Sequence, residues 1–248
     1  MKIICDTNIW YNIATNAIQI DAFKNHELIA TFINIDELAK THNLVDNFEL
    51  IRSVLRSIFK YKSQELFYPP FVHIKMLADK NYQYDTLSKH SDIFISTQKI
   101  AQGHEILPEY INKINEFCYS RQMPFIEMTK YFNEQVFQIK GSIKDKKKHR
   151  KENPTVLNRK LISHFVSLQT DEPGLSDNFD FSQIELLEKT MRVFFNELEL
   201  SHDMKVEEND WYDLFQLAYV QPGMKYWTKE KRWLILIEKA GMNKYLFQ

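Results

Sequence analysis

The feature that most constrains the fold is a short apolar run at the start of the chain, which ends at an acid. Residues 3–5 (IIC) are followed directly by Asp6, Thr7 and Asn8. An unbroken apolar run of this length is typical of a strand buried on both faces, as in a parallel sheet. Ligands of open α/β sheets bind at the carboxyl ends of the strands, so Asp6 lies where a functional carboxylate is expected. The alternative is that Thr7 or Asn8 caps a helix and that Asp6 only interacts favourably with the helix dipole.

A second junction of the same kind follows the apolar run at 27–33 (ELIATFI). Asn34 is a favourable N-cap, and Glu37 lies three residues later, which is the spacing of a capping box. One interpretation is that Glu37 folds back onto the amide of Asn34. The other is that Glu37, like Asp6, follows the end of a parallel strand, so that two acids meet at one edge of the sheet.

The C-terminal part repeats the pattern. A helix is expected over 209–219, with an apolar stripe from Trp211 to Tyr219. Asp210 and Asp213 project from one side of its first turn, where like charges repel unless a cation lies between them. The helix dipole offsets part of that repulsion and is the alternative explanation. A strand expected at 225–228 is followed by Glu230.

The remaining elements are expected from periodicity and from turn residues. They are a helix over 44–61, a strand over 71–77, helices that begin near Pro108 and Pro124, a loop over 170–181, a helix over 182–200 and a final strand over 244–247. The sequence therefore predicts an α/β domain built from residues 1–77 and 201–248, in which a parallel sheet is flanked by helices. Residues 78–200 are expected to form a large, mainly helical insertion.

Composition limits the classes of function. The chain has 32 basic and 33 acidic residues, so it is not a globally basic nucleic-acid binder. Its strongest charge run is 144–151 (KDKKKHRK), where Lys146, Lys147, Lys148 and Arg150 are candidates for nucleic-acid contact. The alternative is that this run is a solvated surface.

Cysteine content and hydropathy suggest where the protein resides. Cys5 and Cys118 are the only cysteines and form no disulfide framework, which is typical of a reduced, cytoplasmic protein. The chain does not start with the long apolar run of a signal peptide, and we expect no membrane-spanning segment.

Five carboxylates are thus expected near strand ends and helix starts: Asp6, Glu37, Asp210, Asp213 and Glu230. Such a cluster is stable in ionised form only with divalent cations, and hard oxygen ligands select Mg²⁺ or Mn²⁺. A pair of such ions held by carboxylates is used for phosphodiester displacement by activated water. The sequence has no Walker-type loop, zinc-ligand spacing or nucleophile triad that would predict a different chemistry.

The ordered set of motifs resembles the PIN-domain family of metal-dependent ribonucleases. The matching segments are IICDTNIW, ATFINIDEL, NDWYDLFQLAYV and KYWTKEKRW. The resemblance covers about half of the chain. It implies catalytic and metal-binding roles for Asp6, Glu37, Asp210 and Asp213, a metal-binding role for Glu230 and supporting roles for Asn8 and Thr228. The last family acid is usually Asp, and small PIN toxins lack the long helical segment.

Two functions follow from this resemblance. One is a Mg²⁺- or Mn²⁺-dependent endoribonuclease with RNA as its partner. The other is a catalytically impaired PIN scaffold that binds nucleic acid or protein. A protein inhibitor and a second copy of the chain stay open as further partners.

Overall fold

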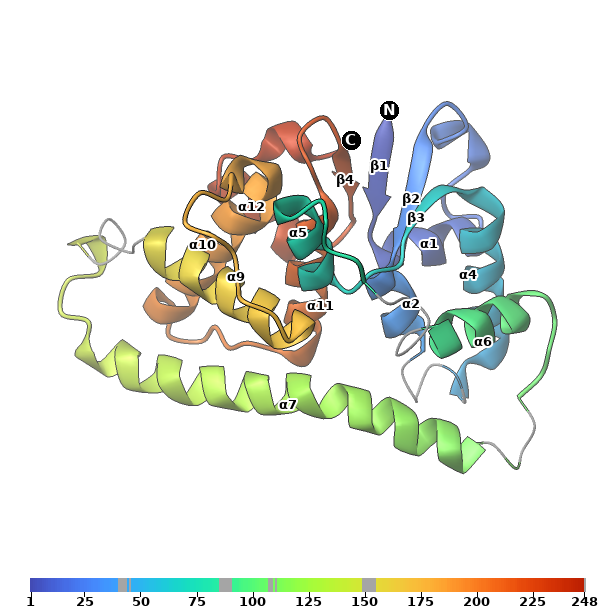
Figure 1. The fold of residues 1–248 in the computed structure, drawn as a ribbon, viewed down its shortest axis with the longest axis horizontal. Helices are drawn as coiled ribbons and strands as arrows, with labels where there is room; N and C mark the ends of the chain where they lie inside the picture. The colour runs from blue at the N-terminus through green and yellow to red at the C-terminus, as the bar shows by residue number, and fades with distance from the viewer. Residues whose placement is uncertain are drawn as a thin grey trace.

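The protein is an α/β structure built around a four-stranded, all-parallel sheet (Figure 1). The computed structural model describes residues 1–39, 44, 46–84, 91–106, 109, 111–148 and 155–247. The strands lie in the order β3-β2-β1-β4. Their bounds are β1 (Lys2–Cys5), β2 (Glu27–Thr31), β3 (Lys62–Leu66) and β4 (Lys225–Trp227).

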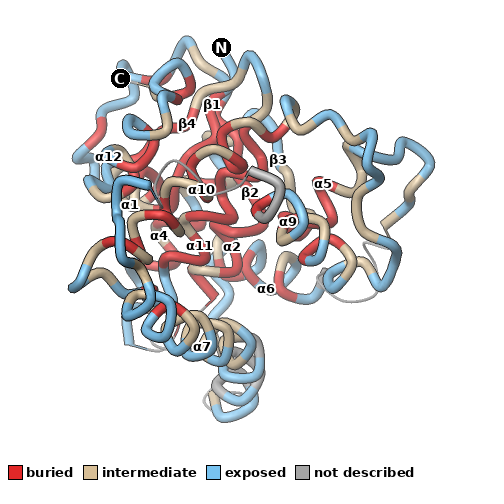
Figure 2. The backbone as a smooth tube through the Cα atoms, turned by 90° about the vertical axis from the view of Figure 1, so that its left-hand side faces the viewer, coloured by how far each residue is buried: buried red, intermediate tan, exposed pale blue. Residues whose placement is uncertain are grey.

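Each face of the sheet has its own apolar core, because alternate side chains of a strand point to opposite faces. Ile4 and Ile29 belong to one core, whereas Ile3 and Leu28 belong to the other. Figure 2 shows the buried residues concentrated along the strands and on the helices beside them. The expectation of a doubly covered parallel sheet is confirmed.

The core that contains Ile4 is completed by helices from the middle and the end of the chain. They are α5 (Pro70–Ala78), α9 (Thr155–Thr170), α10 (Glu185–Leu200), α11 (Glu208–Gln216) and α12 (Lys231–Lys239), with the 3-10 turns η3 (Phe181–Ile184) and η4 (Leu217–Tyr219). Two of these helices, α9 and α10, come from the segment expected to be an insertion. They pack in the same core as α11 and α12.

The opposite core is covered by helices from the first half of the chain. They are α1 (Thr7–Ala14), α4 (Phe48–Tyr61) and α6 (Ser91–Ala101), and the short turn η1 (Ile20–Ala22) lies between α1 and β2. Helix α2 (Phe32–Leu38) joins the two cores, because its Phe32 and Ile33 pack in one and its Ile35 and Leu38 in the other.

A long helix, α7 (Ile111–Ser142), runs along the outside of the molecule (Figure 1). Pro124 was expected in the first turn of a helix, but it lies inside α7. The part of α7 after Pro124 is held by Phe125, Met128 and Phe132, which pack on the core. These contacts compensate for the backbone hydrogen bond that proline cannot donate. Pro108 lies outside the described residues.

Two expected strands are wrong. Residues 71–77 lie in helix α5, because Pro70 occupies the first helical position, which its fixed φ suits, and the following apolar side chains are buried. The true third strand, β3, has the polar sequence KSQEL and a largely exposed pattern, so it carries no apolar signal. Near the C-terminus, the chain forms the turn η5 (Asn243–Tyr245) and a single parallel bridge between Leu246 and Tyr226 instead of a full strand.

The described part of the chain contains no helix with the length and apolar character needed to cross a membrane.

Candidate active site

Asp6 lies at the carboxyl end of β1, where the strand order changes direction. The chain passes from β1 through β2 to β3 on one side and returns to place β4 on the other side of β1. In open parallel sheets, ligands bind in the crevice at such a switch point. The sheet topology therefore places Asp6 and Thr228, which follow β1 and β4, where a binding site is expected.

Asp6 is buried and is held by three donors. Its Oδ1 accepts a hydrogen bond from the backbone N–H of Thr7 (2.6 Å), which makes it the N-cap of α1. Its Oδ2 accepts from Asn8 Nδ2 (2.7 Å) and from Thr228 Oγ1 (2.5 Å). The helix is therefore capped by Asp6 itself, and not by Thr7 or Asn8 as the alternative interpretation had it. The two residues expected to support it, Asn8 and Thr228, both contact it directly.

Glu37 lies on α2, and the cap of this helix differs from the one expected. The helix begins at Phe32 with Thr31 as its N-cap, and Asn34 accepts a hydrogen bond from the Thr31 N–H (2.9 Å). Asn34 is therefore the third residue of the helix and not its cap, so the expected fold-back of Glu37 onto a cap at Asn34 does not apply. Glu37 is half-buried, one turn further along.

Helix α11 presents two acids in different surroundings. Asp213 is half-buried, and its Oδ2 accepts a hydrogen bond from the indole N–H of Trp233 on α12 (2.7 Å). Asp210 is buried; its Oδ2 accepts from the Glu207 N–H (2.8 Å), and its Oδ1 lies 2.7 Å from Arg232 Nη1. Asp210 thus caps its own helix and pairs with a cation of the protein.

The pKa values of Asp6 and Asp213 are both raised, and the charge of Glu37 contributes to both shifts. Burial raises the pKa of Asp6 to about 7; the negative charges of Glu37 and, more weakly, Glu230 add to the shift, and the Thr228 hydroxyl opposes it. Burial likewise raises the pKa of Asp213 to about 8, and the charges of Asp6 and Glu37 add to that shift. Three elements therefore bring these carboxylates into one electrostatic cluster. We call Asp6, Glu37 and Asp213 the acid cluster.

Tyr226 on β4 is buried beside the acid cluster. Its pKa lies well above the ordinary value because of burial and because of the charges of Asp6, Asp213 and Glu37. Within the described part of the structure, its hydroxyl has no hydrogen-bond partner of good geometry. The nearby Thr228 hydroxyl opposes the pKa shift, but it donates its hydrogen to Asp6.

Glu230 lies at the edge of this arrangement. Its side chain is exposed, and its backbone N–H donates to Thr228 Oγ1 (2.9 Å). It occupies the N-cap position of α12. Its charge reaches Asp6, so it belongs to the neighbourhood of the acid cluster without being buried in it.

The described lysines of the basic run lie on the surface. Lys146, Lys147 and Lys148 are exposed, and Lys146 Nζ donates to the Leu200 carbonyl (3.0 Å). Arg150 lies outside the described residues.

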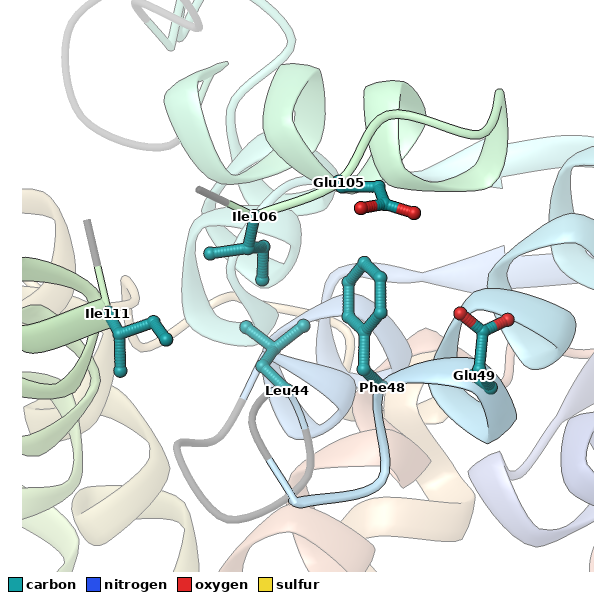
Figure 3. Close-up of a pocket in the computed structure, with 6 residues that line it drawn as sticks. All are labelled: Leu44, Phe48, Glu49, Glu105, Ile106 and Ile111. Atoms are coloured by element: carbon teal, nitrogen blue, oxygen red, sulfur yellow. The ribbon is translucent and has the colours of Figure 1, made fainter. Parts of the chain in front are cut away.

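A pocket lined by described residues lies apart from the acid cluster. It has a volume of about 280 Å³ and lies between the start of α4, the end of α6 and the start of α7 (Figure 3). Its lining is Leu44, Phe48, Glu49, Glu105, Ile106 and Ile111.

No protein-family model, curated protein or solved structure significantly matches this chain. Among the described residues, no three Asp, Glu, His or Cys side chains are placed to hold a metal ion as they stand. A cation at the acid cluster would therefore need these side chains to turn toward it.

Several residues around the acids were not predicted. Arg232 follows Glu230 by two residues, and its pairing with Asp210 has no sequence signature. Trp233 lies on α12, and the hydrogen bond that its indole N–H donates to Asp213 has no sequence signature. Gln216 is one helical turn after Asp213, and this spacing was the only available indication that the two residues share a face.

Proposed function

We propose that this protein is a Mg²⁺- or Mn²⁺-dependent endoribonuclease of the PIN type, with Asp6, Glu37 and Asp213 as its principal metal ligands. The observation that carries this proposal is that the charge of Glu37 adds to the raised pKa of Asp6, and the charges of Asp6 and Glu37 add to the raised pKa of Asp213. They come from the end of β1, from α2 and from α11, three separate elements of the chain. Carboxylates that raise one another's pKa are destabilising for the protein without a cation or protons.

The residues of the acid cluster fit a hard divalent cation by their chemistry. They offer carboxylate oxygens, the ligands that Mg²⁺ and Mn²⁺ prefer. The Tyr226 hydroxyl is a buried polar atom without a partner of good geometry among the described residues, as expected where a further group binds. When bound, such an ion lowers the pKa of water and neutralises charge that develops on a phosphate.

The protein's own residues would orient the ligands. Thr228 and Asn8 both donate to Oδ2 of Asp6 and so fix the plane of that carboxylate. Trp233 fixes Oδ2 of Asp213, whose Oδ1 accepts no hydrogen bond from the described residues. Hydrogen bonds from outer partners of this kind orient metal ligands and raise metal affinity. The exposed side chain of Glu230 would contact the ion from the outer edge of the acid cluster.

The alternative function, a PIN-like scaffold that binds nucleic acid or protein without cleaving it, is favoured by a different observation. Arg232 already neutralises Asp210, one of the acids that the family resemblance assigns to the metal. In this alternative, the acid cluster holds protons instead of a cation, and nucleic acid or protein binds elsewhere on the surface.

RNA cleavage with added Mn²⁺ tests the proposal. Purified protein should cut a mixed pool of structured RNAs with Mn²⁺ and lose this activity in excess chelator. Asp213→Asn should abolish cleavage, whereas Asp92→Asn, which removes an exposed acid from the first turn of α6, should not. Glu230→Gln measures how far the site depends on the rim acid. RNA binding without cleavage under all conditions would support the scaffold function.

A further inference from the structure

Two buried amide side chains meet behind the acid cluster. Asn34 on α2 and Gln216 at the end of α11 are almost fully inaccessible to solvent. Asn34 Nδ2 donates to the carbonyl oxygen of Cys5 (3.1 Å), and Gln216 Nε2 donates to the same oxygen (3.0 Å). This carbonyl belongs to the last residue of β1 and directly precedes Asp6.

The two amides bind the Cys5 carbonyl at the point where β1 and β2 stop pairing. Residue pairing between β1 and β2 runs from Lys2 to Ile4 and stops before Cys5. Past this point, the carbonyl of Cys5 accepts from side chains of two helices. The amides therefore connect β1 with α2 and α11 at the edge where the acids lie.

Both amides are engaged on their oxygen side as well. Gln216 Oε1 accepts from the Thr31 hydroxyl (2.8 Å), and Asn34 Oδ1 accepts from the Thr31 N–H (2.9 Å). Asn34 Nδ2 also donates to Oγ1 of Thr7 (3.1 Å). Thr7 is the residue after Asp6. We call Asn34, Gln216 and Thr31 the amide bridge. Each polar group of the bridge has a hydrogen-bond partner. The bridge therefore defines one arrangement of the backbones of β1, α2 and α11.

Each end of the amide bridge lies one helical turn from an acid. Glu37 is three residues after Asn34 on α2, and Asp213 is three residues before Gln216 on α11. Residues three apart lie on the same face of a helix. The bridge thus fixes the backbones that carry Asp6, Glu37 and Asp213 relative to one another.

We infer that Asn34 and Gln216 are positioning residues, which set the distances among Asp6, Glu37 and Asp213 through their shared contact with the Cys5 carbonyl. The effect of these two residues on metal binding rests on the proposed function. Their effect on the distances among the acids does not rest on it.

The test replaces each amide by an apolar side chain of similar size, in Asn34→Leu and Gln216→Met. Thr31→Val is a milder third variant that removes only a hydroxyl from the bridge. The control is Val166→Ala, a cavity in α9 that removes no atom of the bridge's hydrogen bonds and lowers the melting temperature by leaving a void. Mn²⁺ affinity is measured by calorimetric titration of the metal into each variant.

We expect the bridge variants to bind Mn²⁺ about 10- to 100-fold more weakly, as is typical when an outer partner of a metal ligand is lost. Val166→Ala should bind Mn²⁺ as the wild type does, even where it melts at the same temperature as a bridge variant. Bridge variants that melt lower but keep wild-type Mn²⁺ affinity would overturn the inference.

A second readout needs no metal. The indole N–H of Trp233 donates to Asp213, so its proton resonance, assigned by its loss in Trp233→Phe, reports the position of that carboxylate. We expect this resonance to shift in Gln216→Met and Thr31→Val and to stay in place in Val166→Ala. If the wild type binds no Mn²⁺, the proposed function fails, but this resonance still tests the role of the bridge. A chemical shift equal to that of the wild type in both Gln216→Met and Thr31→Val overturns the inference.

Discussion

Arg232 Nη1 lies 2.7 Å from Oδ1 of Asp210, so Asp210 pairs with a cation of the protein, although its charge still adds to the pKa shift of Asp213. The Asp210 side chain is only 5% exposed, so its negative charge depends on Arg232 and on the Glu207 N–H. Any cation that used Asp210 as a ligand would compete with Arg232.

The first prediction is that Arg232→Gln destabilises the metal-free protein by about 1.5–3 kcal/mol, the usual worth of a hydrogen bond to a charged group. The same change should strengthen Mn²⁺ binding if Asp210 is a metal ligand, because the competing cation is gone. Chemical denaturation with and without Mn²⁺ measures both effects. Destabilisation that Mn²⁺ does not relieve would leave Asp210 a purely structural residue.

The second prediction concerns pH in the absence of metal. The folded protein holds Asp6 with a pKa of about 7 and Asp213 with a pKa of about 8, both above the ordinary value of 3.8. Between about pH 4 and 8 the folded state therefore binds protons that the unfolded state does not. This contribution to stability is fully present below pH 4 and is lost as pH rises through 7 and 8.

Its magnitude follows from linkage. Each such proton gives a slope of about 1.4 kcal/mol of unfolding free energy per pH unit. Asp213→Asn should flatten the slope and make the metal-free protein more stable than the wild type at pH 8. Denaturation midpoints at pH 5, 7 and 9 measure this difference. A wild type whose stability is level across this range would show that the two carboxyls ionise normally.

The third prediction concerns the orientation of Asp6. Thr228→Val removes the hydroxyl that donates to Asp6 over 2.5 Å and should raise the pKa of Asp6 further. We expect weaker Mn²⁺ binding as a result. Thr97→Val is the matched control, since its buried hydroxyl donates only to carbonyls within α6. Equal Mn²⁺ affinity in both variants would remove Thr228 from the site.

The fourth prediction concerns the exposed lysines. If Lys146, Lys147 and Lys148 contact RNA phosphates, each neutralising Lys→Gln change should reduce the salt slope of RNA affinity by roughly one. We expect Lys147→Gln to test this most directly, since Lys146 already donates to the Leu200 carbonyl. A slope unchanged in the triple variant would identify the run as a solvated surface.

Much of the sheet could be predicted from local pattern. The apolar runs at β1 and β2 and the aromatic strand β4 are buried on both faces, and such runs carry the clearest signal of a parallel sheet. The stripe from Trp211 to Tyr219 is buried as expected. Strand β3 could not be found, because its residues are mostly polar and exposed and it is recognised only by its pairing with β2.

The acid cluster could be predicted only in part. Asp6 and Glu37 follow strand ends, and parallel strands bring such ends together wherever they lie in the sequence. The ion pair of Asp210 could not be predicted in this way, because its partner Arg232 comes from a different helix. Asn34 was expected to cap α2, yet its role depends on Gln216, which is distant in the chain.

The most direct test of the metal site is the melting temperature of the protein with and without Mn²⁺. At a metal concentration about 100-fold above the dissociation constant, binding adds about 2.7 kcal/mol to stability. For a chain of this length, that raises the melting temperature by about 5–10 °C, at about 2–4 °C per kcal/mol. We predict this rise for the wild type and a much smaller one for Asp6→Asn and Asp213→Asn. A wild-type melting curve that does not respond to millimolar Mn²⁺, with both variants melting lower, would contradict the metal site and leave Asp6 as a helix cap and Asp213 as the hydrogen-bond partner of Trp233.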